Sequence, residues 1–307
     1  PRPSVRPLQV YRMTDTGSCG GGVRTKTTIH RRVMERKQGR GGWPEGGRQL
    51  ECHVGDEGLV FERAHRSPRA TELVASPVEL HQLNVQRRLR EANLPKDAFS
   101  FIAPVGISKQ MLESAGRPTA TIDRIDRLSL VRSMLEDPPS RASSELPLPP
   151  GISSRDPQRI EQIRTQVETV TNFHPERITA WRDTADDLYD PIDAESSELL
   201  NAALFVERGL RSQTTKAISE TELVRRATRV IVATDGEGWT EAYPDIGRLT
   251  LLGLSSLSAP HTDLVHAILS TTPVEVHIHF RSETGAYLKR RFDDLLTRSR
   301  PGTEVFE

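Results

Sequence analysis

The stretch LTLLGLSSLSAPHTDLVHAILSTTPVEVHIHF, residues 249–280, carries the clearest secondary-structure pattern in this chain. Its leucine-rich start (249–254) has the continuous apolar pattern of a strand that is buried on both faces. Pro260 suits the first turn of a helix, and the apolar residues over 264–269 recur at helical spacing. Apolar and polar residues then alternate over 274–280, which predicts a second strand. A buried strand, a helix and another strand make a βαβ unit, so we expect an α/β domain with a parallel sheet.

The composition favours a cytoplasmic protein with no membrane partner. No apolar run approaches the roughly 20 residues that cross a bilayer, and the amino terminus lacks the apolar core of a secretory signal. The two cysteines, Cys19 and Cys52, supply neither a disulfide framework nor a four-ligand metal site. Apolar residues make up only 35% of the chain, so we expect part of it not to pack into a core.

The formal net charge of zero hides an asymmetry along the chain. Residues 1–70 carry 14 Lys and Arg against 7 Asp and Glu, a net charge of +7, so the remainder carries −7. The same residues hold 11 of the 21 glycines. A basic, glycine-rich segment is typical of nucleic-acid binding, and more often of a poorly ordered segment of solvated charge.

A loop near residue 20 has part of the pattern of a phosphate-binding loop, which is a glycine, four residues and then Gly-Lys-Ser/Thr. Here Gly20 is followed by four residues and then by Thr25, Lys26 and Thr27. We expect a short strand before this loop and a helix after it, which is the context of such a site. Thr25 replaces the second glycine, and its Cβ resists the tight backbone wrap around a phosphate. Gly20, Lys26 and Thr27 are therefore assigned as a degenerate nucleotide-binding site.

The sequence divides into five segments. Hydrophobic periodicity is absent over 39–72, so we expect the amino-terminal segment to be largely disordered. The segments are a basic glycine-rich start (1–75), the first part of a P-loop-like core (76–137), a linker rich in Pro and Ser (138–154), a helical insertion (155–233) and the βαβ part of the core (234–307).

The helix expected over 121–137 begins with the charged run DRIDR. Asp123 and Arg127 lie one turn apart and are predicted to pair on a solvated face, rather than to serve as an acid/base or metal feature. The predicted apolar stripe consists of Ile122, Ile125, Leu128, Val131 and Leu135.

Four histidines fall within 19 residues: His261, His266, His277 and His279. His277 and His279 are two apart on a strand, so they share one face and could hold a metal together. Their phrase EVHIHF is similar to the strand that opens amidohydrolase metal enzymes such as dihydroorotase. Only 28 residues follow His279, too few for the barrel of that family. We favour two partly exposed histidines on an edge strand, and assign no metal site and no catalytic residue.

Three segments together resemble one family. They are the loop at Gly20, the small-residue turn and Arg/Leu helix of 112–135, and the unit over 249–280. The combination resembles the amino-terminal, helicase-like half of AddB-type helicase–nuclease subunits, relatives of the UvrD-like helicases. The resemblance implies an ATPase-like α/β core with a helical insertion, DNA as a partner, a second helicase subunit, and ATP with Mg²⁺ as cofactors.

Two departures change what the resemblance implies. The loop at Gly20 is degenerate, and the strand ending at Leu254 is followed by Ser255 and Ser256, where an active helicase needs Asp-Glu to hold Mg²⁺. ATP binding is then weak or absent. We expect a helicase-like component of a DNA-repair helicase–nuclease that contacts DNA and acts as a scaffold. The alternatives are a non-enzymatic interaction module and, more distantly, a metal-dependent hydrolase of the amidohydrolase type.

Overall fold

The structure, a computed structural model, describes residues 50–55, 58–64, 71–136, 153, 156–186 and 192–306. All of them belong to one compact unit, Gly46–Glu307. The strand and helix expected on either side of the Gly20 loop, and the loop itself, lie outside the described residues.

The described strands form one all-parallel sheet in the order β1-β5-β4-β2-β3. They are β1 (Leu50–Val54), β2 (Glu72–Ala75), β3 (Ser100–Ile102), β4 (Arg248–Leu254) and β5 (Glu275–Phe280). β4 is central, because it is hydrogen-bonded to β5 on one side and to β2 on the other. The chain passes from β4 through α11 (Ala259–Thr271) to β5. The predicted βαβ unit and the predicted α/β class with a parallel sheet are therefore confirmed.

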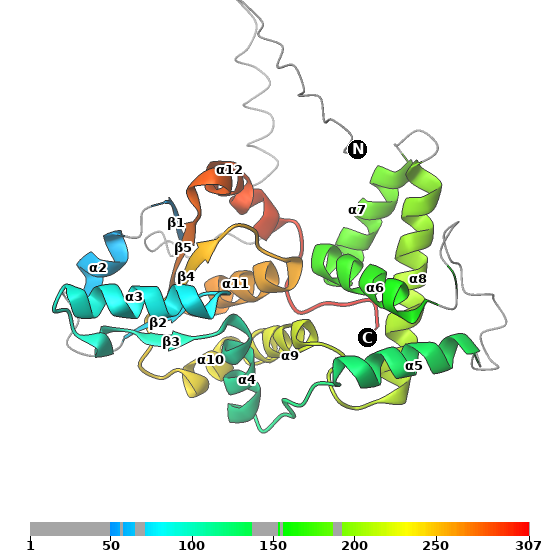
Figure 1. The fold of residues 1–307 in the computed structure, drawn as a ribbon, viewed down its shortest axis with the longest axis horizontal. Coiled ribbons are helices and arrows are strands. Elements are labelled where there is room, and N and C mark those ends of the chain that lie inside the picture. The colour runs from blue at the N-terminus through cyan, green and yellow to red at the C-terminus, as the bar shows by residue number, and fades with distance from the viewer. Residues whose placement is uncertain are drawn as a thin grey trace, which may run out of the picture. The chain divides into compact units, whose positions relative to one another are not determined.

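Helices cover both faces of this sheet (Figure 1). One face packs against α2 (Gly58–Ala64) and α3 (Glu79–Glu91), and a short 3-10 turn, Lys96–Ala98, follows α3. The other face packs against five helices. These are α4 (Pro104–Ser114), α9 (Glu220–Ala233), α10 (Glu237–Ala242), α11 and α12 (Ser282–Thr297).

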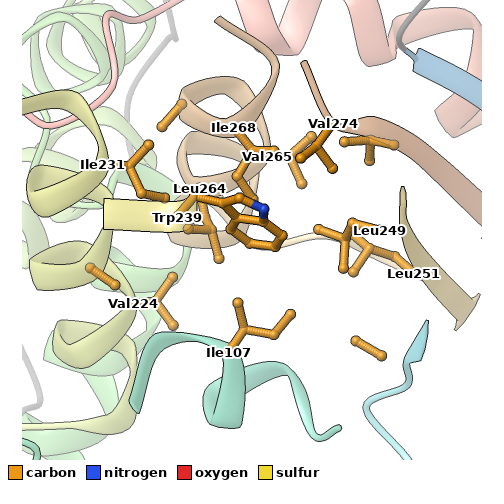
Figure 2. Packing of buried hydrophobic residues seen from close by; sticks show 14 of the residues in the cluster. Ile107, Val224, Ile231, Trp239, Leu249, Leu251, Leu264, Val265, Ile268 and Val274 are labelled. Carbon is orange, nitrogen blue, oxygen red and sulfur yellow. The ribbon is translucent and has the colours of Figure 1, made fainter. Parts of the chain in front are cut away.

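The central strand β4 is buried on both faces, as its apolar sequence predicted. Leu251 points into the larger core, where Trp239 of α10 lies among side chains of α9, α11 and β4 (Figure 2). Leu252 points to the opposite face and packs with residues such as Leu89 of α3. Their exposed fractions are 7% and 0%, so either side chain leaves water almost completely on folding.

The helical insertion predicted over 155–233 included α9, but α9 packs against the sheet. Four other helices between β3 and β4 form a block whose buried side chains make clusters of their own. The helices are α5 (Arg124–Glu136), α6 (Pro157–Thr171), α7 (Pro175–Asp186) and α8 (Ile192–Gln213). The predicted N-cap of α6 is confirmed, since Asp156 accepts a hydrogen bond of 3.0 Å from the backbone N–H of Arg159. Ser219 caps α9 in the same way, through a 3.1 Å bond from the N–H of Glu222.

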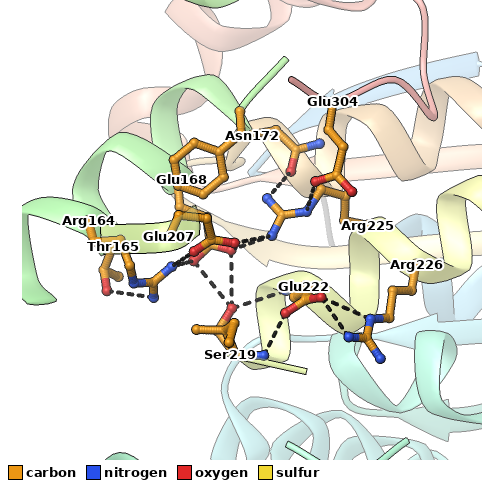
Figure 3. A network of polar contacts seen from close by, with 12 residues as sticks. Arg164, Thr165, Glu168, Asn172, Glu207, Ser219, Glu222, Arg225, Arg226 and Glu304 are labelled. Atoms are coloured by element: carbon orange, nitrogen blue, oxygen red, sulfur yellow. Dashed lines mark hydrogen bonds and ion pairs between the residues drawn. The ribbon is translucent and has the colours of Figure 1, made fainter. Parts of the chain in front are cut away.

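Buried ion pairs join this helical block to α9 and to the end of the chain (Figure 3). Arg164 of α6 is fully buried and donates to Glu168 at 3.1 Å and to Glu207 of α8 at 2.7 Å. Arg225 of α9 reaches the same Glu168 at 2.9 Å and lies 3.4 Å from Glu304. A buried charge is tolerated only when opposite charges surround it. The network therefore ties the insertion to the α/β core at one place.

The expectation of irregular structure over 39–72 is wrong for the part of it that is described. β1, α2 and the start of β2 lie there. β1 alternates an apolar row (Leu50, Cys52, Val54) with a polar row (Glu51, His53), but five residues are too few to stand out as a periodic pattern. The described α/β core therefore includes β1, α2 and β2, all of which start before residue 76.

Two details of the helix predicted over 121–137 are also wrong. Ile125 is 74% exposed and does not belong to the buried stripe, whereas Val131 does. Arg127 does not pair with Asp123 but turns inward to Glu161 of α6 at 2.5 Å. Asp123 instead accepts a hydrogen bond of 2.7 Å from the N–H of Ile125 and so shapes the start of α5.

Candidate binding pocket at the carboxyl ends of the strands

A pocket of about 710 Å³ lies at the carboxyl ends of β2, β3 and β4. The connections diverge here, because the chain runs from β2 outward to β3 and from β4 in the opposite direction to β5. In open parallel sheets, ligands bind in the crevice where neighbouring connections diverge in this way. The topology therefore makes this pocket the candidate binding site.

The end of β4 forms one wall of the pocket. Gly253 has a φ of +72° and lies at an irregularity in the pairing with β5. A Cβ at this position would come within 3.0 Å of Nε2 of His81. Glycine therefore fits both the backbone conformation and the space. Ser255 and Ser256 follow directly and line the pocket.

The start of α11 supplies a second wall. Oγ of Ser258 and Nδ1 of His261 are 2.8 Å apart and hydrogen-bonded. Burial lowers the pKa of His261 and so favours its neutral imidazole. The first residues of α4 and α11 also line the cavity, as does Arg281, and Glu220 is its one lining carboxylate in the described chain. Helix amino termini and a guanidinium favour an anionic ligand.

The sequence-predicted site residues are only partly placed. Gly20, Lys26 and Thr27 lie outside the described residues, so their assignment as a nucleotide site stays a prediction. Ser255 and Ser256 lie where the sequence put them, at the carboxyl end of a central strand.

The two histidines of the HxH phrase do share one face of β5, as predicted. The expectation of an edge strand with exposed histidines is wrong, because β5 lies between β1 and β4 and the exposed fractions of His277 and His279 are 8% and 1%. Burial, with the nearby charges of Arg63 and Arg248, lowers the pKa of His277 to about 4.

The residues of β1 that lie beside these two histidines were not predicted from the sequence. His53 contacts both rings, with centroid distances of 5.4 Å to His277 and 4.5 Å to His279. Glu51 is paired with His277 in the register of the two strands. Glu51 and His53 alternate with apolar residues, which places them on one face of a strand. This pattern is informative only when residues 50–54 are known to form a strand.

Comparison with known proteins identifies the family to which the chain belongs. No curated protein matches the chain significantly. No helix among the described residues is long and apolar enough to cross a membrane. Residues 34–307 match the family described as halobacterial UvrD-like protein, and the match begins after the Gly20 loop. Because this match covers most of the sequence, the chain belongs to the halobacterial UvrD-like protein family and is helicase-like.

Proposed function

We propose that the chain is a helicase-like component of a DNA-repair helicase–nuclease, of the AddB type, that contacts DNA and acts as a scaffold without turning over ATP. The observation that carries the proposal is the family match, because UvrD-like relatives bind DNA. The parallel sheet with a helical block between β3 and β4 agrees with the architecture expected of such a relative.

The chemistry of the pocket supports the lack of turnover. A Mg²⁺ ion beside nucleotide phosphates is normally held by carboxylate oxygens at the end of a central strand. Ser255 and Ser256 occupy that position after β4, and a neutral hydroxyl neither balances the ion's charge nor orients water as a carboxylate does. Glu220 lies across the pocket on α9, where it is within 3.9 Å of Lys109. These residues do not fit a hydrolytic Mg²⁺–nucleotide site.

The proposed DNA contact rests on the charge of the amino-terminal segment. Residues 1–45, which precede the compact unit, carry 10 Lys and Arg against 3 Asp and Glu. A protein that neutralises phosphates with such side chains releases counterions, so its affinity falls steeply with salt. Phosphate contacts carry no sequence information, so we expect similar affinity for unrelated sequences.

The test compares the full chain with residues 46–307, which keep the whole described core. Binding of labelled single-stranded DNA is measured by fluorescence anisotropy at several salt concentrations. Each phosphate contact contributes about −0.7 to the slope of log K against log salt, so a chain making about five contacts gives a slope near −3.5. We expect the shortened chain to lose most of this slope. Equal binding by both chains, or by neither, would favour an interaction module with no nucleic-acid role.

A further inference from the structure

The polar face of β1 and β5 brings together three side chains with metal-ligating atoms. Glu51 and His53 come from β1 and His277 comes from β5, and their ligand atoms all lie within 4.8 Å of one another. The parallel register places Glu51 beside His277 and His53 beside His279. Two strands, rather than the HxH phrase of β5 alone, therefore build this cluster.

The distances between the ligand atoms match those around a tetrahedral metal. Nε2 of His53 is 3.2 Å from Nδ1 of His277. Oε2 of Glu51 is 3.5 Å from the same nitrogen of His53 and 3.7 Å from that of His277. Tetrahedral zinc with bonds of about 2.0–2.1 Å separates its ligand atoms by about 3.4 Å. One ion can therefore touch all three atoms with small side-chain adjustments.

From this geometry we propose that Glu51, His53 and His277 form a zinc site that links the edge strand β1 to β5, with its fourth position open to solvent. The Glu51 side chain is 51% exposed, so an ion can reach the cluster from outside. Two imidazoles and one carboxylate are an established ligand set for zinc with an open position. This inference is independent of the proposed role in DNA contact.

The surroundings hold the ligands in place. The ring of His279, which is buried, lies on that of His53 and limits its rotation. Oε2 of Glu275 is 3.9 Å from Nε2 of His277, the nitrogen that would not bind the metal. A carboxylate near the outer nitrogen of a ligating histidine orients the ring and fixes its tautomer.

Two nearby cations do not leave the site positively charged. Arg63 is paired with Glu72 at 2.9 Å, and Arg248 is paired with Glu275 at 2.5 Å. With Glu51 added, three carboxylates face two guanidinium groups around the cluster. The formal charge around the cluster is therefore −1, although at His277 itself Arg63 and Arg248 outweigh Glu51.

A bound metal would replace the existing hydrogen bond between His53 and His277. Without metal, one of the two facing nitrogens of His53 and His277 donates its proton to the other. Zinc takes the lone pairs of both nitrogens, so one ring changes to its other neutral tautomer and both rings tilt toward Glu51. The change stays within the side chains and leaves the pairing of β1 with β5 intact.

The test uses the full chain without a histidine tag, stripped with a chelator and titrated with Co²⁺ and Zn²⁺. We expect the strong visible bands of tetrahedral Co²⁺, displaced by one equivalent of Zn²⁺. A saturating excess of Zn²⁺ should raise Tm by about 5 °C, because an ion that binds only the folded chain stabilises it. Glu51→Gln keeps the shape of a half-exposed side chain, so it tests the site without threatening the fold.

Glu51→Gln and His53→Gln should each bind Zn²⁺ at least about tenfold more weakly and lose the rise in Tm. The matched control is His81→Gln, a histidine of α3 that lies outside the cluster, and it should behave like the unaltered chain. The proposal is overturned if the unaltered chain gives no tetrahedral Co²⁺ spectrum. It is equally overturned if Glu51→Gln binds as tightly as the control, since the ion then sits elsewhere.

Discussion

Replacing Arg164 by methionine tests whether its buried ion pairs stabilise the packing of α6 on α8 within the helical block. Arg164 has no exposed surface and donates to three carboxylates, at 2.7 Å to Glu161, 3.1 Å to Glu168 and 2.7 Å to Glu207. Methionine fills much of the same volume but removes every one of these hydrogen bonds. Three carboxylates with little or no exposure then lose a cation.

The size of the effect follows from what remains after the change. Removing one partner of a buried ion pair costs about 3–5 kcal/mol, because the other charge stays buried. Arg225 still lies 2.9 Å from Glu168 and 3.5 Å from Glu207, so the three losses do not simply add. We therefore expect the free energy of unfolding to fall by about 4 kcal/mol and Tm to fall by roughly 10 °C.

Thermal and urea unfolding followed by circular dichroism measure this change. Arg132→Met is the matched control, since the Arg132 side chain is 69% exposed and its ion pair, at 3.5 Å, is with the exposed Glu136. That change should cost less than about 1 kcal/mol. Arg164→Met combined with Glu207→Leu should destabilise by less than the sum of the two single changes, because the second removes a stranded charge. An Arg164→Met chain as stable as the control would refute the reasoning.

Three further predictions concern the buried strand β4, the Glu304 side chain and the Cys52 thiol. Leu252→Asp places a charge at a fully buried position and should abolish the cooperative thermal transition. Leu80→Asp, at a position that is 65% exposed, should keep the transition. A normal transition in the Leu252→Asp chain would contradict the buried strand. Burial alone would raise the pKa of Glu304, but Arg211, Arg225 and Arg229 outweigh it and hold that pKa below 4.5. The stability that these ion pairs contribute is present above pH 4.5 and is lost as the pH falls through the depressed pKa of Glu304. Glu304→Gln should therefore reduce the fall of Tm at acid pH. An unchanged plot of Tm against pH would argue against the ion pairs. Burial and Asp293 raise the pKa of Cys52 to about 11, which leaves roughly one thiol in a thousand ionised at pH 8. Iodoacetamide should therefore label Cys52 far more slowly in the native chain than in urea. Peptide mass spectrometry measures the two labelling rates.

The parts of the fold that sequence predicts are those with long hydrophobic patterns. The strand–helix–strand unit over 249–280 was predicted because burial on both faces of β4 demands a continuous apolar run. β1 and α2 were missed because five and seven residues give too little pattern. The five residues of β1 form a strand because they are hydrogen-bonded to β5, which lies far away in the sequence.

The polar sites show the same limit. His53 and His277 are 224 residues apart, so no local pattern links them. Arg127 and Arg164 each have the sequence context of a solvated helix face, yet each also pairs with a carboxylate of another helix, Arg127 with Glu161 and Arg164 with Glu207. By contrast, the position of Ser255 and Ser256 followed from the end of a predictable strand.

DNA-stimulated ATP turnover tests the central claim most directly. The full chain is incubated with ATP, Mg²⁺ and single-stranded DNA, and phosphate release is compared with that of Lys26→Ala, which removes the lysine of the degenerate loop. We expect both chains to bind the DNA and neither to release phosphate above background, because Ser255 and Ser256 lack the carboxylates that would hold Mg²⁺. Turnover that depends on DNA and disappears in Lys26→Ala would contradict this expectation.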